Sequence, residues 1–142
     1  MKVLFDNNLS EAITRAIAAL TEEKRLAERV VHLQEMFPAG MADTTWMDKL
    51  GALGSRWVVV TRDKLNKHEG DERRAIGRNG LTTYVLDPQW AHQTFWPMAS
   101  RLVEWWPLIV EHARTARVGV YRVPWKKGTA RQLASCRMGA RG

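Results

Sequence analysis

The chain has 142 residues, 45% of them hydrophobic, so it is long enough to bury one compact core but too short for two. This composition excludes a wholly disordered chain, and no stretch approaches the roughly 18 consecutive apolar residues of a membrane-spanning helix. The single cysteine, Cys136, excludes an internal disulfide. Because the first residues lack the pattern of a secretory signal, we expect a reducing, cytoplasmic location.

The net charge of +7 comes from 22 basic and 15 acidic residues and is concentrated towards the C-terminus. Residues 113–142 contain eight of the basic residues and no acidic one. Such a segment suits a polyanionic partner, because each neutralised phosphate releases counterions. The same charge could instead serve only solubility.

Apolar runs separated by turn residues predict alternating strands and helices in the first part of the chain. Residues 2–6 predict a buried strand, and an amphipathic helix that Ser10 can cap follows it. Residues 29–33 predict a second strand. After a loop rich in turn residues, a second helix is expected over residues 45–53.

The second part of the chain continues this alternation. Residues 57–61 (WVVVT) are the clearest strand, residues 72–80 a short helix and residues 81–86 a fourth strand. The tryptophan-rich residues 89–114 predict two helices, and residues 117–123 an edge strand. Continuous apolar strands alternating with helices are typical of an α/β fold with a mainly parallel sheet, both faces of which are covered.

The composition changes after Pro124, where little remains to be buried. We therefore predict one domain over residues 1–123 and a basic tail over residues 124–142, mobile unless a partner orders it. The basic residues in and beside this tail that are predicted to bind a nucleic acid or another polyanion are Arg122, Lys126, Lys127 and Arg131.

Acidic residues follow the predicted strands, where functional groups gather in parallel sheets. Asp6 closes the first strand and Asp63 lies two residues beyond the third. If these strands are neighbours, the two residues stand about 5 Å apart. Carboxylates that close repel each other, so one takes up a proton or a cation sits between them. Oxygen ligands without a Cys or His cluster favour Mg²⁺ or Mn²⁺.

Each acidic residue also has a purely structural interpretation. Asp6 could cap the first helix, and Asp63 could form a surface ion pair with a basic neighbour. Asp43 could be a helix N-cap or could project its carboxylate over the strand ends. Asp87 precedes a proline at a helix start, which explains it fully.

Four segments resemble, in order and spacing, the short PIN-like domains of bacterial VapC-type toxins: LFDNNLS, DTTWMDKLGALG, WVVVTRDK and LTTYVL. The resemblance covers residues 1–123. It implies a PIN-like three-layer α/β sandwich in which an acidic cluster binds Mg²⁺ or Mn²⁺ and hydrolyses RNA phosphodiester bonds. It also implies the toxin of a toxin–antitoxin pair, with an antitoxin protein as partner.

The resemblance also assigns individual residues. Asp6 matches the first acid of the family, Asp63 the aspartate of its T-x-D motif, and Asp43 the acid of the middle helix, with Glu35 as the alternative. Many relatives carry a further acid at the position of Leu65. The following loop and helix offer three replacements: Glu69, Asp71 and Glu72.

In the mechanism that this site implies, the metal holds a phosphate oxygen and activates a water for in-line attack. Asp6 and Asp63 would be direct ligands, and Asp43 would complete the shell or orient the water. Asn8 could bind the scissile phosphate or be a turn residue, and Thr61 could hold Asp63 in place. The basic residues that could hold flanking phosphates, or be ordinary surface charges, are Arg62, Lys64 and Arg73.

Six of the seven tryptophans divide into two groups. Trp57, Trp96 and the pair at 105–106 fit a core or a homodimer interface, whereas Trp46 and Trp125 could stack on RNA bases. The rival to a ribonuclease is a noncatalytic PIN-like module that binds nucleic acid or protein, because the acid expected at position 65 is missing.

Overall fold

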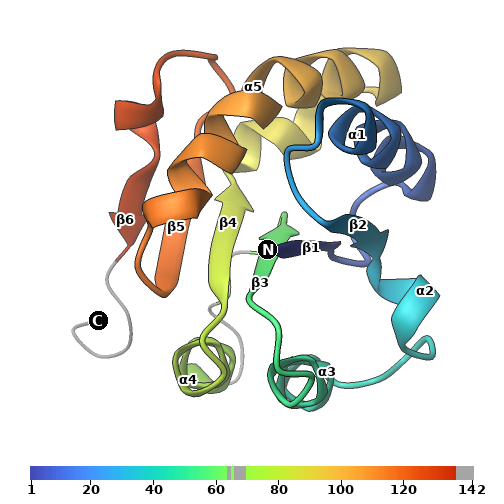
Figure 1. The fold of residues 1–142 in the computed structure, drawn as a ribbon. Coiled ribbons are helices and arrows are strands. Elements are labelled where there is room, and N and C mark those ends of the chain that lie inside the picture. The colour runs from blue at the N-terminus through green and yellow to red at the C-terminus, as the bar shows by residue number, and fades with distance from the viewer. Residues whose placement is uncertain (64, 66–69, 137–142) are drawn as a thin grey trace.

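The structure is a computed structural model that describes residues 1–63, 65 and 70–136. Its centre is a six-stranded sheet in the order β2-β1-β3-β4-β5-β6 (Figure 1). The parallel strands are β1 (Lys2–Phe5), β2 (Arg29–His32), β3 (Trp57–Thr61), β4 (Thr82–Leu86) and β5 (Gly119–Val123). The last strand, β6 (Ala134–Cys136), pairs antiparallel with β5. The predicted α/β fold with a mainly parallel sheet is confirmed.

Helices cover both faces of the sheet. The helices are α1 (Glu11–Lys24), α2 (Leu33–Met36), α3 (Asp43–Gly51), α4 (Asp71–Arg78) and α5 (Phe95–Thr115), with 3₁₀ turns η2 (Pro88–His92) and η3 (Ala130–Gln132). In Figure 1, α1 and α5 lie on one face, and α3 and α4 on the other. Successive strand residues face opposite ways, so Phe5 packs towards α5 while Leu4 belongs to the core under α3 and α4. This division explains why the strands are apolar throughout.

The segment predicted as two helices, residues 89–114, contains the turn η2 and the single helix α5. Pro97 is the third residue of α5, where a missing N–H costs nothing because the first turn has no carbonyl partners. Pro107 lies inside the helix, whose buried stripe from Leu102 to Ile109 continues across it. Within the described part of the chain, no helix has the length and apolar character that a membrane span requires.

The sheet continues beyond residue 123. β5 was expected at the edge, and this prediction is wrong because β6 covers it. Leu133 is buried in the core on the α1 and α5 face, and the Trp125 ring packs edge-on against Trp90 with centroids 4.9 Å apart. These apolar anchors hold residues 124–136 against the domain, contrary to the expectation of a mobile tail. Residues 137–142 lie outside the described chain.

The structure contradicts the prediction for Trp46 and narrows the prediction for Trp96 to its homodimer alternative. Trp57 and the pair at 105–106 are buried, as expected. Trp46 is also buried, so the prediction that it stacks on RNA bases is wrong. Trp96 is 77% exposed and is therefore not part of the core. Trp125 is half-buried, and the guanidinium of Arg101 lies 4.3 Å from its ring centroid.

Candidate metal centre

The carboxyl ends of β1 and β3 bring Asp6 beside Thr61. The two strands are parallel neighbours with Phe5 opposite Val60, and the Asp6 amide donates to the Val60 carbonyl at 2.9 Å. The Asp6 side chain is buried at the end of this pair. It accepts hydrogen bonds from the Thr61 hydroxyl at 2.7 Å and from the Asn7 amide at 2.6 Å. Asp6 is therefore held rigidly at the sheet edge.

Thr61 also fixes the loop that follows β3. Its Oγ1 accepts from the Asp63 amide at 2.9 Å and from the Asn8 side-chain amide at 3.3 Å. Asn8 Oδ1 in turn accepts from the Arg62 amide at 3.1 Å. Asn8 thus ties the loop after β1 to the loop after β3, and Thr61 links the backbone of Asp63 to the carboxylate of Asp6.

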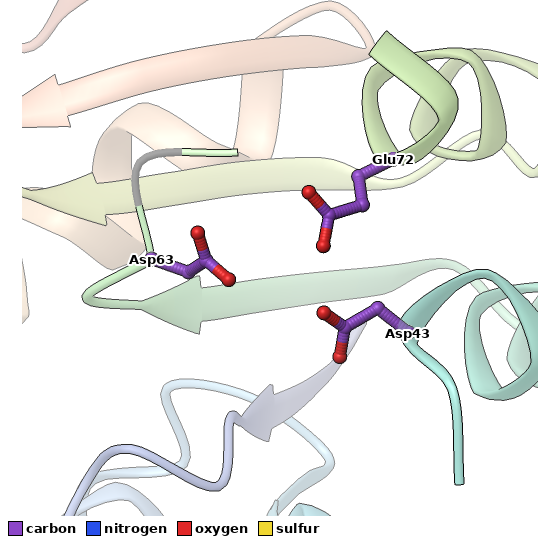
Figure 2. A group of neighbouring side chains, drawn as sticks. All are labelled: Asp43, Asp63 and Glu72. Carbon is purple, nitrogen blue, oxygen red and sulfur yellow. The ribbon is translucent and has the colours of Figure 1, made fainter. Parts of the chain in front are cut away.

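Three carboxylates converge at this edge of the sheet. Asp43, Asp63 and Glu72 each offer one oxygen, and these oxygens lie within 4.8 Å of one another. Figure 2 shows the three side chains pointing towards a common space from the start of α3, the loop after β3 and the start of α4. Glu72 is fully buried, whereas Asp43 and Asp63 are partly exposed.

Asp6 lies close enough to two of the clustered acids for their charges to affect its pKa. Burial raises the pKa of the Asp6 carboxyl above its ordinary value, and the negative charges of Asp43 and Asp63 raise it further. The hydrogen bonds from Thr61 and Asn7 act in the opposite direction. Asp6 is therefore a fourth acid in the field of Asp43 and Asp63, and a cation would relieve the repulsion among them.

The residues present fit a hard divalent cation. Mg²⁺ holds oxygen ligands at about 2.0–2.1 Å, so ligands on opposite sides of the ion lie about 4.2 Å apart. Oxygens within 4.8 Å reach that spacing through small side-chain movements. Carboxylate ligands alone favour Mg²⁺ or Mn²⁺ over metals that prefer nitrogen or sulfur.

The structure distinguishes among the candidates for a further acid. Glu72 joins Asp43 and Asp63. Asp71, the preceding residue on α4, is half-exposed and forms an ion pair with Arg74. Lys64 and Glu69 lie outside the described residues. One acid of the α4 segment therefore faces the cluster and its neighbour faces solvent.

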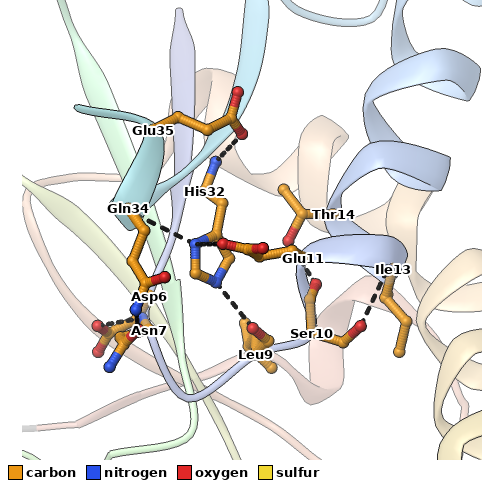
Figure 3. A network of polar contacts seen from close by, with 10 residues as sticks. All are labelled: Asp6, Asn7, Leu9, Ser10, Glu11, Ile13, Thr14, His32, Gln34 and Glu35. Carbon is orange, nitrogen blue, oxygen red and sulfur yellow. Dashed lines mark hydrogen bonds and ion pairs between the residues drawn. The ribbon is translucent and has the colours of Figure 1, made fainter. Parts of the chain in front are cut away.

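Glu35 has a structural role away from the cluster. Its side chain accepts from the His32 amide at 2.8 Å, while His32 Nδ1 accepts from the Gln34 amide at 3.2 Å (Figure 3). These reciprocal bonds cap α2, a helical turn that the sequence placed partly in the second strand. His32 Nε2 donates to the Leu9 carbonyl at 2.8 Å, which satisfies the buried ring.

Leu65 occupies the position at which many relatives carry an acid. Its side chain is 2% exposed and packs in the core under α3 and α4. Its amide donates to Asp63 Oδ1 at 2.9 Å, and its carbonyl accepts from Arg73 Nε at 3.2 Å. Leu65 therefore orients Asp63 through its backbone, and Glu72 on α4 contributes the carboxylate that Leu65 lacks.

The other predicted phosphate contacts lie at several places. Arg62 and Arg73 flank the cluster in sequence on the β3 loop and on α4. Arg122 forms a two-point ion pair with Asp87, at 2.9 and 3.0 Å. Lys126, Lys127 and Arg131 are exposed, and Arg131 belongs to η3, which packs against α5. Arg131 thus lies on the α5 side of the sheet.

Two hollows adjoin the cluster on the α3 side. One of about 350 Å³ is lined by Asp43, Thr44 and Glu72, among others. A second of about 150 Å³ lies between Asn7 and the loop 33–41 and also reaches Asp43. An extended polymer could therefore lie across the acids.

Trp46 positions Asp43, a contact that the sequence analysis missed. Its indole Nε1 donates to Asp43 Oδ1 at 3.0 Å from three residues along α3. The spacing of Asp and Trp by three positions at a helix start is the signal that could have indicated it. The indole is buried, so its orientation is fixed by the core.

Replacing Trp46 by Phe is expected to weaken Mn²⁺ binding about 10- to 100-fold, the usual effect of losing a hydrogen bond that orients a metal ligand. Isothermal titration calorimetry measures this change. Trp57→Phe is the matched control, because Trp57 lies in the same core and its Nε1 has no hydrogen-bond partner among the described residues. Equal losses of affinity in both variants would show that core packing, not the bond to Asp43, is responsible.

Comparison with known families finds one match. The sequence model of the family described as PIN like domain matches residues 1–88, which carry all four acids. No curated protein and no solved structure matches the chain.

Proposed function

Because the chain belongs to the PIN like domain family, we propose that it is a ribonuclease that uses Mg²⁺ or Mn²⁺ to hydrolyse RNA phosphodiester bonds, and that it is the toxin of a toxin–antitoxin pair. PIN-like domains are commonly nucleases. The observation that carries the proposal is the convergence of Asp43, Asp63 and Glu72 from three separate elements beside the buried Asp6. The proposal includes a cytoplasmic location, a cognate antitoxin and a possible homodimer.

The chain supplies a rigid negative cradle for the cation. Asp43, Asp63 and Glu72 would hold it, and Asp6 is a fourth acid beside them. A divalent cation bound there would neutralise charge on a phosphate oxygen and lower the pKa of a water, so that the hydroxide formed could attack phosphorus. Thr61 keeps Asp6 and Asp63 in register, because its hydroxyl bonds the side chain of one and the backbone of the other.

The electrostatics of the chain favour a nucleic acid as substrate. The net charge is +7 although the site itself is acidic. Basic side chains outside the cluster can hold phosphates on either side of the bond that is cut, while the cation screens the acids from the scissile phosphate. A noncatalytic module would need the same basic residues but no set of converging carboxylates.

The test is cleavage of a fluorescently labelled single-stranded RNA by the full chain with Mn²⁺, Mg²⁺ or EDTA. We expect cleavage with either cation and none with EDTA. Because water rather than the ribose 2′-hydroxyl is the nucleophile, a 2′-O-methyl substrate is expected to be cut as well. Binding of RNA without cleavage in any of these conditions would favour the noncatalytic module.

The toxin role is tested separately in cells. Induced expression of the wild-type chain is expected to stop bacterial growth, and co-expression of a small reading frame adjacent to its gene is expected to restore it. Normal growth with a chain that cleaves RNA in vitro would contradict the toxin role while leaving the nuclease intact.

A further inference from the structure

A pocket of about 310 Å³ opens at the carboxyl ends of β4 and β5, on the face covered by α4. Val85, Val120 and Pro88 form apolar walls. Three charged residues, Arg73, Asp87 and Arg122, also line it. Ligand pockets measure roughly 300–1,000 Å³, so this one suits a single small ring system.

The pocket lies next to the acidic cluster through α4. Arg73, which lines the pocket, directly follows Glu72, which faces Asp43 and Asp63. The pocket also involves the end of β4, the neighbour of β3, from which Asp63 extends. A nucleic acid with one phosphate at the cluster could therefore place an adjoining nucleotide in the pocket.

The polar side of the pocket is held in a fixed plane. Arg122 Nε and Nη2 donate to the two carboxylate oxygens of Asp87 at 2.9 and 3.0 Å. The two-point bond orients the guanidinium, and together the two groups present hydrogen-bond donors and acceptors side by side. Base edges carry the complementary arrangement of donors and acceptors, and apolar side chains suit the faces of a base.

The charges of the pocket do not distinguish a nucleotide from an acidic peptide, but its shape does. Two arginines and one aspartate attract an anion of either kind. The flat two-signed pair beside apolar walls, however, matches a nucleobase and has no counterpart in a carboxylate side chain. The position of the pocket also favours a nucleotide, because the pocket adjoins the site at which the phosphodiester bond would be cut.

We propose that this pocket binds the base of a nucleotide beside the cleaved phosphodiester bond, and that the Asp87–Arg122 pair selects which base. The role of this base selection in RNA cleavage rests on the proposed nuclease function. The pocket itself can be tested without any cleavage.

The first test compares Arg122→Lys with Arg78→Lys. Arg78 donates to Asp48 through the same two nitrogens, each at 3.0 Å, and it does not line the pocket, so it is a matched control. Sequencing the ends produced from a randomised single-stranded RNA measures base preference around the cut. We expect a preference at one position in wild type and in Arg78→Lys, reduced about tenfold in Arg122→Lys because lysine loses the planar fork. The same preference in all three proteins would overturn the proposal.

The second test follows the Val85 and Val120 methyl signals of the full chain by NMR, without metal. The probes are the four nucleoside 5′-monophosphates and a glutamate-rich peptide. We expect one nucleotide to shift both methyl signals in wild type and Arg78→Lys, and to shift them less in Arg122→Lys. Such shifts in a chain that cleaves no RNA would support the pocket while the nuclease proposal fails. Shifts with the peptide alone would overturn the nucleobase assignment.

Discussion

Replacing Asp63 by Asn is expected to reduce Mn²⁺-dependent RNA cleavage by about three orders of magnitude, the rate equivalent of losing roughly 4 kcal/mol of transition-state stabilisation. Asp63 contributes one of the three converging oxygens, and its backbone is tied to Thr61 at the end of β3. The amide has the same shape but lacks the negative charge that holds the cation. Single-turnover cleavage of a labelled RNA measures the loss.

Asp48→Asn is the control for this substitution. Asp48 is a half-exposed aspartate of α3 that pairs with Arg78, and it is not among the clustered acids. We expect this variant to cleave RNA at close to the wild-type rate. Fluorescence anisotropy without metal is expected to give similar RNA affinities for all three proteins. Full cleavage by Asp63→Asn would remove Asp63 from the metal centre.

Glu72→Gln is expected to abolish the stabilisation of the folded chain by Mn²⁺. At a concentration 100 times its Kd, a ligand specific for the folded state stabilises it by about 2.7 kcal/mol. For a chain of this size that corresponds to about 5–10 °C in the midpoint of thermal unfolding. In the variant the cation loses a buried carboxylate ligand, so most of this shift is expected to disappear, together with RNA cleavage.

Thermal unfolding without metal tests the same variant independently, because the expected change has the opposite sign. Without a cation, Glu72→Gln removes one negative charge from a group of mutually repelling carboxylates. The variant is therefore expected to unfold at a higher temperature than wild type in EDTA and at a lower one in Mn²⁺. Differential scanning calorimetry measures both midpoints.

Asp71→Asn is the matched control for Glu72→Gln. Asp71 precedes Glu72 on α4, and its side chain pairs with Arg74 at the surface (Figure 2 shows Glu72 turned inwards). We expect this variant to keep both the Mn²⁺ shift and cleavage. Loss of the shift in Asp71→Asn but not in Glu72→Gln would exchange the roles of the two residues.

Much of the fold could be predicted because strand and helix patterns are local. The apolar run 57–61 and the three-and-four spacing after Ser10 can be recognised without knowledge of any contact. The succession of such strands and helices also implies a parallel sheet, whose carboxyl ends share one edge. The position of Asp6 and Asp63 at the ends of neighbouring strands was therefore a reasonable expectation before their surroundings were known.

The strand β6 escaped prediction for a physical reason. Residues 134–136 have no long apolar run, and their pairing depends on the exposed edge of β5. Leu133 and Trp125 anchor this segment on surfaces formed by remote parts of the chain. A short strand held by distant partners leaves little pattern in its own residues.

Local sequence patterns indicate the strands β1 to β5 and the acids after β1 and β3, because periodicity and strand ends are properties of adjacent residues. Only the tertiary structure decided that Glu72, and not Asp71 or Glu35, joins Asp43 and Asp63. Neighbouring helix residues point about 100° apart, so the docking of α4 on the sheet determines which carboxylate turns inwards. That orientation depends on packing between segments far apart in the chain.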